Sequence, residues 1–250
     1  MGRKFKGLKP LKTAFCFLTT LPLKGETGTK ASDFQNALPF FPWVGAFLGA
    51  GLFVLHYLLS GRISLSFEAV FLLLFWAIIT GGLHLDGLAD TADGCFSSRS
   101  QDRILEIMKD SRIGTMGVLA LFFVLGFKFL ALYEVCEKSL GAALFFSPLF
   151  GRFAILAVMY HLSYARPEAG LGSLFSGKKY SYKKGVLIAG LLLIFFTGIR
   201  GVFLFFIPVF LLSGYMVFLK RKIRGYTGDT LGAACELTET LMLVCGAVLF

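Results

Sequence analysis

Residues 65–94 read LSFEAVFLLLFWAIITGGLHLDGLADTADG, an apolar run that ends in two glycines and continues directly into an acidic segment. The apolar part is close to the roughly 20 residues that a helix needs to cross the hydrocarbon core of a membrane. The whole chain has the same character, because 56% of its 250 residues are hydrophobic and only 16% are charged. Soluble domains carry roughly 25% charged residues. The sequence therefore predicts a membrane protein.

Seven segments are long and apolar enough to span: 38–60, 65–84, 113–133, 140–162, 184–199, 201–219 and 231–250. We expect one all-α domain over residues 1–250, a polytopic integral membrane helix bundle of about seven transmembrane helices. Residues 1–37 precede the first span, are basic and then apolar, and predict an N-terminal interfacial helix. The fifth and sixth segments are separated only by Arg200 and Gly201, so they form a tight hairpin or a re-entrant pair.

Lysine and arginine give this arrangement an orientation. If the N-terminus lies inside, the inside segments 1–37, 85–112, 163–184 and 220–230 carry twenty of these residues. The outside loops carry three, which are Arg62, Lys138 and Arg200. Cytoplasmic loops of membrane proteins carry such an excess. We expect a multi-pass protein of the cell membrane, with its N-terminus and its acidic clusters on the cytoplasmic side.

Composition also argues against other classes. The net charge of +10 is spread among apolar spans without a basic and aromatic recognition motif, so we expect no nucleic-acid partner. The five cysteines are scattered and form no CxxC pair, which argues against a disulfide framework or a zinc site. The sequence leaves homo-oligomerisation open.

The acidic segment holds Asp86, Asp90 and Asp93, which are spaced i, i+4 and i+7 and share one face of a helix. No basic residue lies between them, so their charges repel unless a cation binds. Hard oxygen ligands without cysteine favour Mg²⁺, and Mg²⁺ often accompanies a phosphate-bearing substrate. The alternative is an ordinary solvated face. His84 contacts substrate or is simply an interfacial histidine.

Three further positions are candidate substrate contacts. Lys109, Asp110 and Arg112 precede the third span, where Ser111 or Thr115 would cap the helix and its amides would suit a phosphate. The alternative is an ordinary basic anchor. Arg152 lies within a span and needs a partner such as Glu236 or Glu239, whereas Lys128 is expected to snorkel. Arg166 lies in the Gly/Pro-rich loop 163–172, a mobile lid or a plain surface loop.

Residues 224–239, RGYTGDTLGAACELTE, hold a second polar cluster. Asp229 or Thr230 would cap the last helix, and Glu236 follows Asp229 on the same face. The cluster also contains Tyr226 and Thr227. A helix start needs only one capping residue, so we interpret this segment as the second half of an active site.

Several segments together resemble the cobalamin synthase family, the adenosylcobinamide-GDP ribazoletransferases. They are FPWVGAFLGA (41–50), GGLHLDGLADTADG (81–94), LEIMKDSRIGTMGVLAL (105–121), GRFAILAVMYHLSYAR (151–166) and GYTGDTLGAACELTE (225–239), in family order over most of the chain. The resemblance implies a Mg²⁺-dependent membrane transferase. It would join adenosylcobinamide-GDP to α-ribazole or its 5′-phosphate and release GMP.

On this reading, Asp86, Asp90 and Asp93 hold Mg²⁺ at the pyrophosphate, and the ribazole 3′-hydroxyl attacks the cobinamide-side phosphorus. Asp93 or Asp229 takes the hydroxyl proton.

Two other functions stay open. Charges within the spans are also typical of transporters and channels, although no internal repeat is evident. The acidic stripe is also similar to that of the CDP-alcohol phosphotransferases, but Asp90 stands where that signature has arginine.

Overall fold

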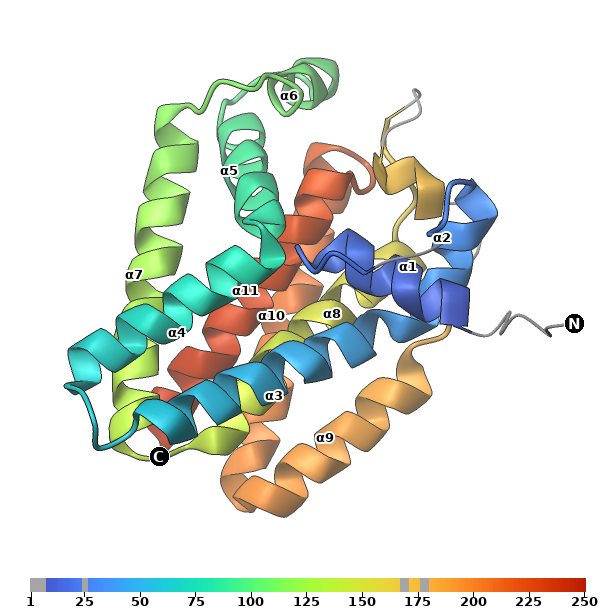
Figure 1. The fold of residues 1–250 in the computed structure, drawn as a ribbon. Coiled ribbons are helices and arrows are strands. Elements are labelled where there is room, and N and C mark those ends of the chain that lie inside the picture. The colour runs from blue at the N-terminus through green and yellow to red at the C-terminus, as the bar shows by residue number, and fades with distance from the viewer. Residues whose placement is uncertain (1–7, 24–26, 167–170, 176–179) are drawn as a thin grey trace, which may run out of the picture.

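The computed structural model describes residues 8–23, 27–166, 171–175 and 180–250, and this part of the chain is almost entirely helical. The elements are α1 (Leu8–Leu18), α2 (Ala31–Ala37), η1 (Leu38–Phe40), α3 (Phe41–Leu59), α4 (Leu65–Thr80), α5 (Leu83–Cys95), α6 (Gln101–Ile107), α7 (Thr115–Glu137), α8 (Gly141–His161), η2 (Leu171–Phe175), α9 (Lys183–Thr197), α10 (Ile199–Lys222) and α11 (Gly228–Leu249). Figure 1 shows them as one helix bundle, which confirms the all-α expectation.

Five segments of the described chain are long and apolar enough to cross a membrane: 31–59, α7, α8, α10 and α11. A sixth results if α4 and α5 count as one span, although they are bent by 87°. We expected about seven, and the difference arises because two helices end early. Gly81 and Gly198 adopt positive φ angles of 62° and 64°, which end α4 and α9 after 16 and 15 residues.

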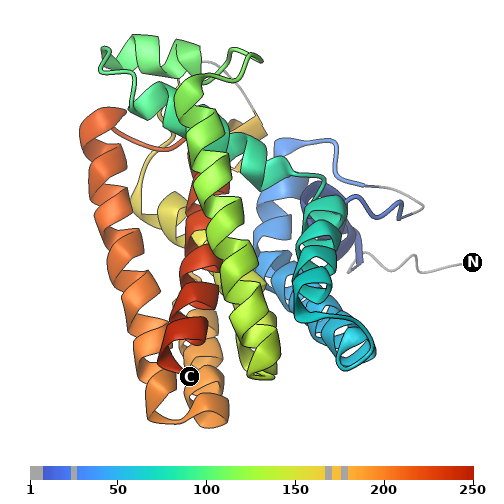
Figure 2. The same cartoon turned by 90° about the vertical axis from the view of Figure 1, so that its left-hand side faces the viewer.

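The loops alternate between the two ends of the bundle. Figure 2 shows α6 at one end, called here the α6 end, and the α3–α4, α7–α8 and α9–α10 turns at the opposite end together with the C-terminus. This alternation is the one that the apolar segments predict. The predicted N-terminal helix is present as α1, which packs against α2 and α3.

Helix α8 lies at the centre of the bundle and α10 at its edge. The apolar window of α8 is 83% buried, whereas that of α10 is only 17% buried. Large apolar side chains such as Phe195 and Phe210 are 80% and 76% exposed. An outer surface of this kind suits lipid, because a soluble protein rarely exposes large contiguous apolar patches.

Four charged side chains form a network inside the bundle. Lys128 on α7 donates hydrogen bonds to Glu236 Oε2 and Glu239 Oε2 on α11, at 2.7 and 2.8 Å, and Arg152 on α8 pairs with the other oxygen of Glu239. All four side chains belong to residues that are at most 4% exposed. The pairing of Arg152 with Glu239 is therefore confirmed.

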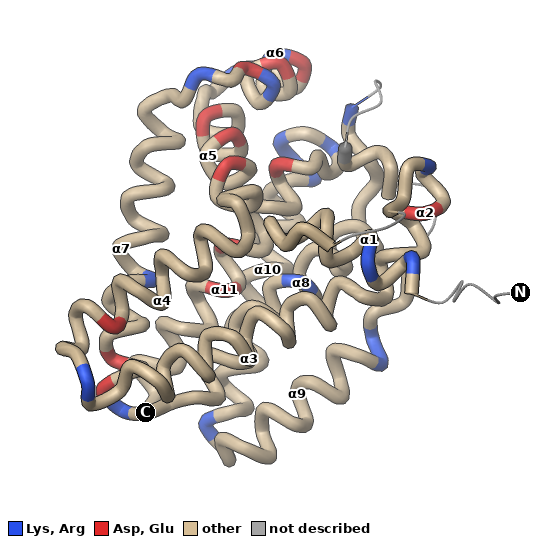
Figure 3. Tube along the Cα trace, viewed as in Figure 1, with Lys and Arg blue, Asp and Glu red and all other residues tan. Residues whose placement is uncertain are grey.

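The expectation that Lys128 snorkels is wrong. Lys128 is 2% exposed, and its ammonium group also lies over the ring of Trp76, 4.3 Å from the ring centroid. Two carboxylates on one neighbouring helix neutralise the ammonium group inside the bundle, so it does not need to reach the membrane surface. Figure 3 shows that charged residues are few and isolated within the otherwise tan helices α7, α8 and α11.

A second buried polar cluster lies toward the opposite end. His56 Nδ1 hydrogen-bonds Glu68 Oε1 at 2.5 Å, and ligand atoms of both lie within 4.8 Å of Cys136 Sγ. The three residues connect α3, α4 and α7. Sequence reasoning missed this cluster, because its members are far apart in the chain and share no motif.

We predict that Lys128→Ala lowers the free energy of unfolding by about 3–5 kcal/mol, because it leaves the buried Glu236 carboxylate without a cation and Glu239 with Arg152 alone. Thermal unfolding of the detergent-solubilised protein measures this. Arg103→Ala is the control, because Arg103 pairs with Glu106 at a site where both side chains are 63% exposed, and the loss there should stay below about 1 kcal/mol. Equal effects of the two substitutions would contradict the structural importance of the buried network.

Candidate active site

The acidic helix owes its direction to two consecutive glycines. Gly81 and Gly82 have φ angles of 62° and 68°, a left-handed backbone conformation that residues other than glycine rarely adopt. The chain turns there by 87° between α4 and α5. Because of this turn, α5 packs against both α7 and α11.

Helices α5 and α11 approach each other closely because each has a glycine that lies against the backbone of the other helix. A Cβ atom at Gly87 would lie 2.7 Å from the carbonyl oxygen of Asp229, and one at Gly232 would lie 3.1 Å from the carbonyl oxygen of His84. This close contact brings Asp86 and Asp229 to one cavity. The two acidic segments of the sequence therefore lie next to each other in the fold.

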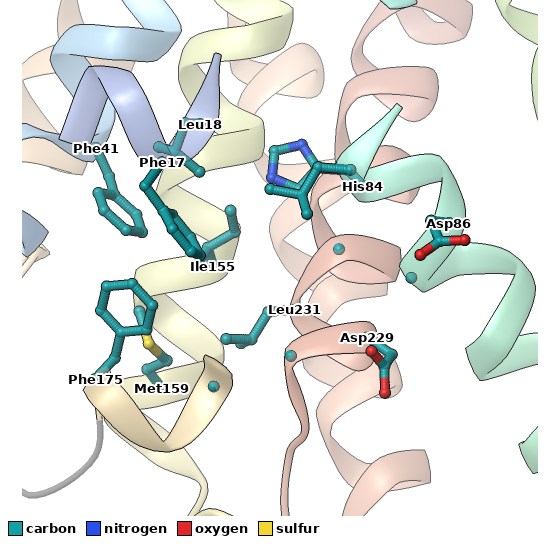
Figure 4. A pocket seen from close by; sticks show the side chains of 15 residues that line it. Phe17, Leu18, Phe41, His84, Asp86, Ile155, Met159, Phe175, Asp229 and Leu231 are labelled. Carbon is teal, nitrogen blue, oxygen red and sulfur yellow. The ribbon is translucent and has the colours of Figure 1, made fainter. Parts of the chain in front are cut away.

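Two hollows meet at Asp86. The first, called here the aromatic hollow, is lined by residues of α1, α3, α5, α8, η2 and α11, among them Phe17, Phe41, Phe175, His84, Asp86 and Asp229. The second, called here the acidic hollow, lies on the other side of α5 and is lined by Asp86, Asp90, Ser111, Ile113 and Leu121 among others. Figure 4 shows the aromatic hollow, with phenyl rings on one side and the two carboxylates on the other.

Asp93 is engaged differently from Asp86 and Asp90. Its two carboxylate oxygens accept hydrogen bonds from the backbone N–H groups of Gly114 and Gly117, at 2.7 and 2.8 Å. Asp93 therefore caps α7, and neither Ser111 nor Thr115 makes the cap that we expected. An acid from another helix takes this role because it also interacts favourably with the positive end of the helix dipole.

The start of α11 is held by the chain that follows α8. Arg166 donates a hydrogen bond to Asp229 Oδ2 at 2.7 Å. In the backbone, the Ala165 N–H donates to the Tyr226 carbonyl and the Tyr226 N–H donates to the Ser163 carbonyl, both at 2.9 Å. Residues 167–170 of the expected lid lie outside the described residues. Burial raises the pKa of Tyr226 to about 12, so its phenol keeps its proton.

Thr227, rather than Asp229 or Thr230, is the N-cap of α11. Its hydroxyl oxygen accepts a hydrogen bond from the Thr230 N–H at 3.3 Å. In turn, the Thr230 hydroxyl oxygen accepts one from the Thr227 N–H at 2.8 Å. Asp229 is therefore free of the capping role and lines the aromatic hollow.

The loop before α7 carries an exposed ion pair. Arg112 binds both oxygens of Asp110, at 3.0 and 2.6 Å. This hydrogen bonding lowers the pKa of Asp110 to about 2. Ser111 borders the acidic hollow between them. Lys109, the third expected contact of this loop, is exposed.

Two expected substrate contacts lie deeper. Arg152 and Glu236 belong to the buried network, are 0% and 4% exposed, and line neither of the two hollows. The structure gives them a positioning role, because they fix α8 and α11 behind the site. His84 lines the aromatic hollow and is 4% exposed.

The donor set at the acidic hollow fits a hard divalent cation. Asp86 and Asp90 border it, Asp93 lies one turn further along the same helix, and the described residues place no basic side chain in its lining. Carboxylate oxygens are the ligands that Mg²⁺ prefers. Asp86 and Asp90 are the residues that would hold it, and Asp93 adds negative charge while it caps α7.

These features define a class of protein: a polytopic helical membrane protein with a carboxylate site at one end of its bundle. The model of the cobalamin-5-phosphate synthase family matches residues 10–247, so the chain belongs to that family.

Curated relatives match over the same length. A protein of Klebsiella pneumoniae (strain 342) is 41% identical over 95% of this chain and 98% of its own. One of Alkaliphilus metalliredigens is 39% identical over 94% of this chain and 95% of its own. Both are named adenosylcobinamide-GDP ribazoletransferase. No solved structure matches this chain.

We predict that Asp93→Ala lowers the free energy of unfolding by about 1–2 kcal/mol, because the first amides of α7 lose their acceptors. Hydrogen exchange at residues 114–118 should speed up, and thermal unfolding should show the loss. Asp102→Ala on α6 is the matched control, because Asp102 is exposed. Unchanged exchange in the Asp93 variant would show that the cap does not hold in solution.

Proposed function

We propose that this chain is an adenosylcobinamide-GDP ribazoletransferase that depends on Mg²⁺. It would join adenosylcobinamide-GDP to α-ribazole or α-ribazole 5′-phosphate and release GMP. The family membership and the names of the relatives support the reaction class. The observation that carries the proposal is the position of Asp86 between two hollows, as a reaction of two substrates requires.

The two hollows suggest how the substrates divide. The acidic hollow, with Asp86 and Asp90, suits the pyrophosphate and its cation. The aromatic hollow, with Asp229 in its lining, suits the acceptor. When bound, Mg²⁺ would neutralise phosphate charge and so favour nucleophilic attack.

In the reaction, the ribazole 3′-hydroxyl oxygen forms a bond to the cobinamide-side phosphorus, and the bond from that phosphorus to the bridging oxygen breaks. GMP leaves with that oxygen. The hydroxyl proton passes to a carboxylate. Of the two candidates, the geometry supports Asp229 over Asp93, because Asp229 lines the aromatic hollow and both oxygens of Asp93 accept backbone hydrogen bonds.

Arg166 has a positioning role in this scheme. Its guanidinium holds Asp229 at 2.7 Å and, with a side chain that is 13% exposed, can also face a phosphate oxygen. Lys109 and Arg112 lie at the loop that borders the acidic hollow and are the further candidates for phosphate contacts.

We further propose that the α6 end faces the cytoplasm. The segments expected inside carry twenty lysines and arginines and the opposite loops carry three. The alternation of loops between the two ends supports this orientation. Both substrates would then reach the site from the cytoplasmic side of the membrane.

The arrangement of charges gives a transporter little support. The charges within the spans bind one another, and Lys128, Arg152, Glu236 and Glu239 line neither hollow. The test that separates the functions is GMP release from adenosylcobinamide-GDP with Mg²⁺. Release that requires α-ribazole or its phosphate supports the transferase, and its absence from well-folded protein overturns the proposal.

We predict that Asp86→Asn or Asp90→Asn lowers kcat by at least about a hundredfold, because each removes a charge that faces the pyrophosphate. The GMP-release assay measures this in protein that still inserts into membranes. Asp102→Asn, outside both hollows, should keep activity near that of the wild type. Near-normal turnover in the Asp86 or the Asp90 variant would refute the assignment of the acidic hollow to the pyrophosphate and its cation.

Metal removal gives an independent prediction. EDTA should abolish GMP release and added Mg²⁺ should restore it, whereas Ca²⁺ should restore little, because Ca²⁺ is larger and takes more ligands with looser geometry. Full activity after exhaustive chelation would contradict the Mg²⁺ dependence.

A further inference from the structure

The aromatic hollow has two chemically distinct parts. One part is lined by apolar side chains from four different elements, chiefly Phe17, Phe41, Ile155, Met159 and Phe175. The other part carries Asp86 and Asp229. Figure 4 shows that these parts lie on opposite sides of the hollow. A ligand that fits it therefore has one flat or apolar end and one polar end.

The aromatic part is a preformed wall. Phe175 contacts three other phenylalanines edge-on, with ring centroids 5.0 Å from Phe17, 5.7 Å from Phe34 and 5.5 Å from Phe41. Rings fixed by such contacts offer rigid surfaces for another ring. The hollow has a volume of about 150 Å³, close to that of an apolar cavity that holds a benzene ring.

One buried polar side chain of the hollow lacks a partner. His84 is 4% exposed, and its Nδ1 atom has no hydrogen-bond partner among the described residues. Because Nδ1 is enclosed by protein and has no partner that would accept a hydrogen bond, the ring proton lies on Nε2. Nε2 belongs to the part of the ring that lines the hollow (Figure 4), where it can donate a hydrogen bond to a ligand.

We propose that the aromatic hollow binds the base of the acceptor nucleoside, with His84 Nε2–H donating a hydrogen bond to the single free ring nitrogen of that base. This rests on the proposed function, which supplies α-ribazole as the acceptor. The base of α-ribazole is a dimethylbenzimidazole, a flat apolar bicycle with one unsubstituted nitrogen. Its ribose then extends toward Asp86 and Asp229, where the 3′-hydroxyl reacts.

The hollow has too few polar side chains to bind guanine, which is the other base in the reaction. Guanine carries several donors and acceptors on its edges, and the apolar part of the hollow offers them only His84. Each polar group of guanine that is buried there without a partner would weaken its binding. The guanine of the GDP-linked substrate therefore lies elsewhere, and the aromatic hollow selects the less polar base.

The direct test measures binding of α-ribazole alone, by equilibrium dialysis against protein in nanodiscs without adenosylcobinamide-GDP. His84→Leu should weaken binding about tenfold, and His84→Gln, whose amide nitrogen reaches about the position of Nε2, should stay within about threefold. The indole riboside, in which C–H replaces the ring nitrogen, should bind the wild type about tenfold more weakly than α-ribazole does. His84→Leu should not weaken that analogue further, because the two changes remove the same bond.

A second substitution tests the aromatic wall. Phe175→Leu should weaken α-ribazole binding about five- to tenfold. Phe146→Leu on α8 is the matched control, because Phe146 is 3% exposed but does not line the hollow. Binding should be unchanged in the control.

The outcomes separate the two proposals. If the wild type releases GMP but the His84 and Phe175 variants bind α-ribazole normally, the binding site is wrong and the function stands. If the Phe175 variant instead loses a co-purified lipid and keeps α-ribazole affinity, the hollow is a lipid site and the inference fails. If the wild type neither binds α-ribazole nor releases GMP, the proposed function itself fails.

Discussion

The rest of the structure depends on the charge network between Lys128, Arg152, Glu236 and Glu239. Three helices contribute to it, and each charge would be costly inside a bundle surrounded by lipid without its partner. Because ion pairs require definite distances, the network fixes how far α7, α8 and α11 can slide against one another. That register fixes the position of the first turn of α11, which carries Asp229. It also fixes the position of the first turn of α7, whose N–H groups Asp93 caps.

The second constraint is the pair of left-handed glycines between α4 and α5. A continuous helix through residues 65–95 would carry the acidic stripe away from α11. The bend instead lays α5 between α7 and α11, and Gly87 allows the contact with Asp229. One helix thereby serves three purposes: Asp93 holds α7, Asp90 faces the acidic hollow, and Asp86 faces both hollows. The three aspartates have different roles because α5 lies between α7 and α11.

Much of the fold and part of the site could be predicted from sequence. The lengths of the apolar segments predict the helices and the alternation of loops between the two ends. The i, i+4 and i+7 spacing predicts that Asp86, Asp90 and Asp93 share one face of a helix. An arginine within a span required an acid, and Glu239 supplies it. The errors concern partners far away in the chain. Lys128 was expected to reach the membrane surface because its acids lie more than 100 residues later. The cap of α7 comes from Asp93 on α5 and not from the neighbouring Ser111 or Thr115.

The sequence by itself determined that this protein is a helical membrane bundle with a carboxylate stripe and a second polar cluster near its end. Periodicity, apolar length and local charge are properties of neighbouring residues, so they can be seen in the chain. Only the tertiary structure decided that Asp86 lies between two hollows and that Asp229 joins it. It also decided that phenylalanines from α1, α3 and η2 line the same hollow as His84. A cavity is the space that several helices leave between them, and its shape depends on their packing.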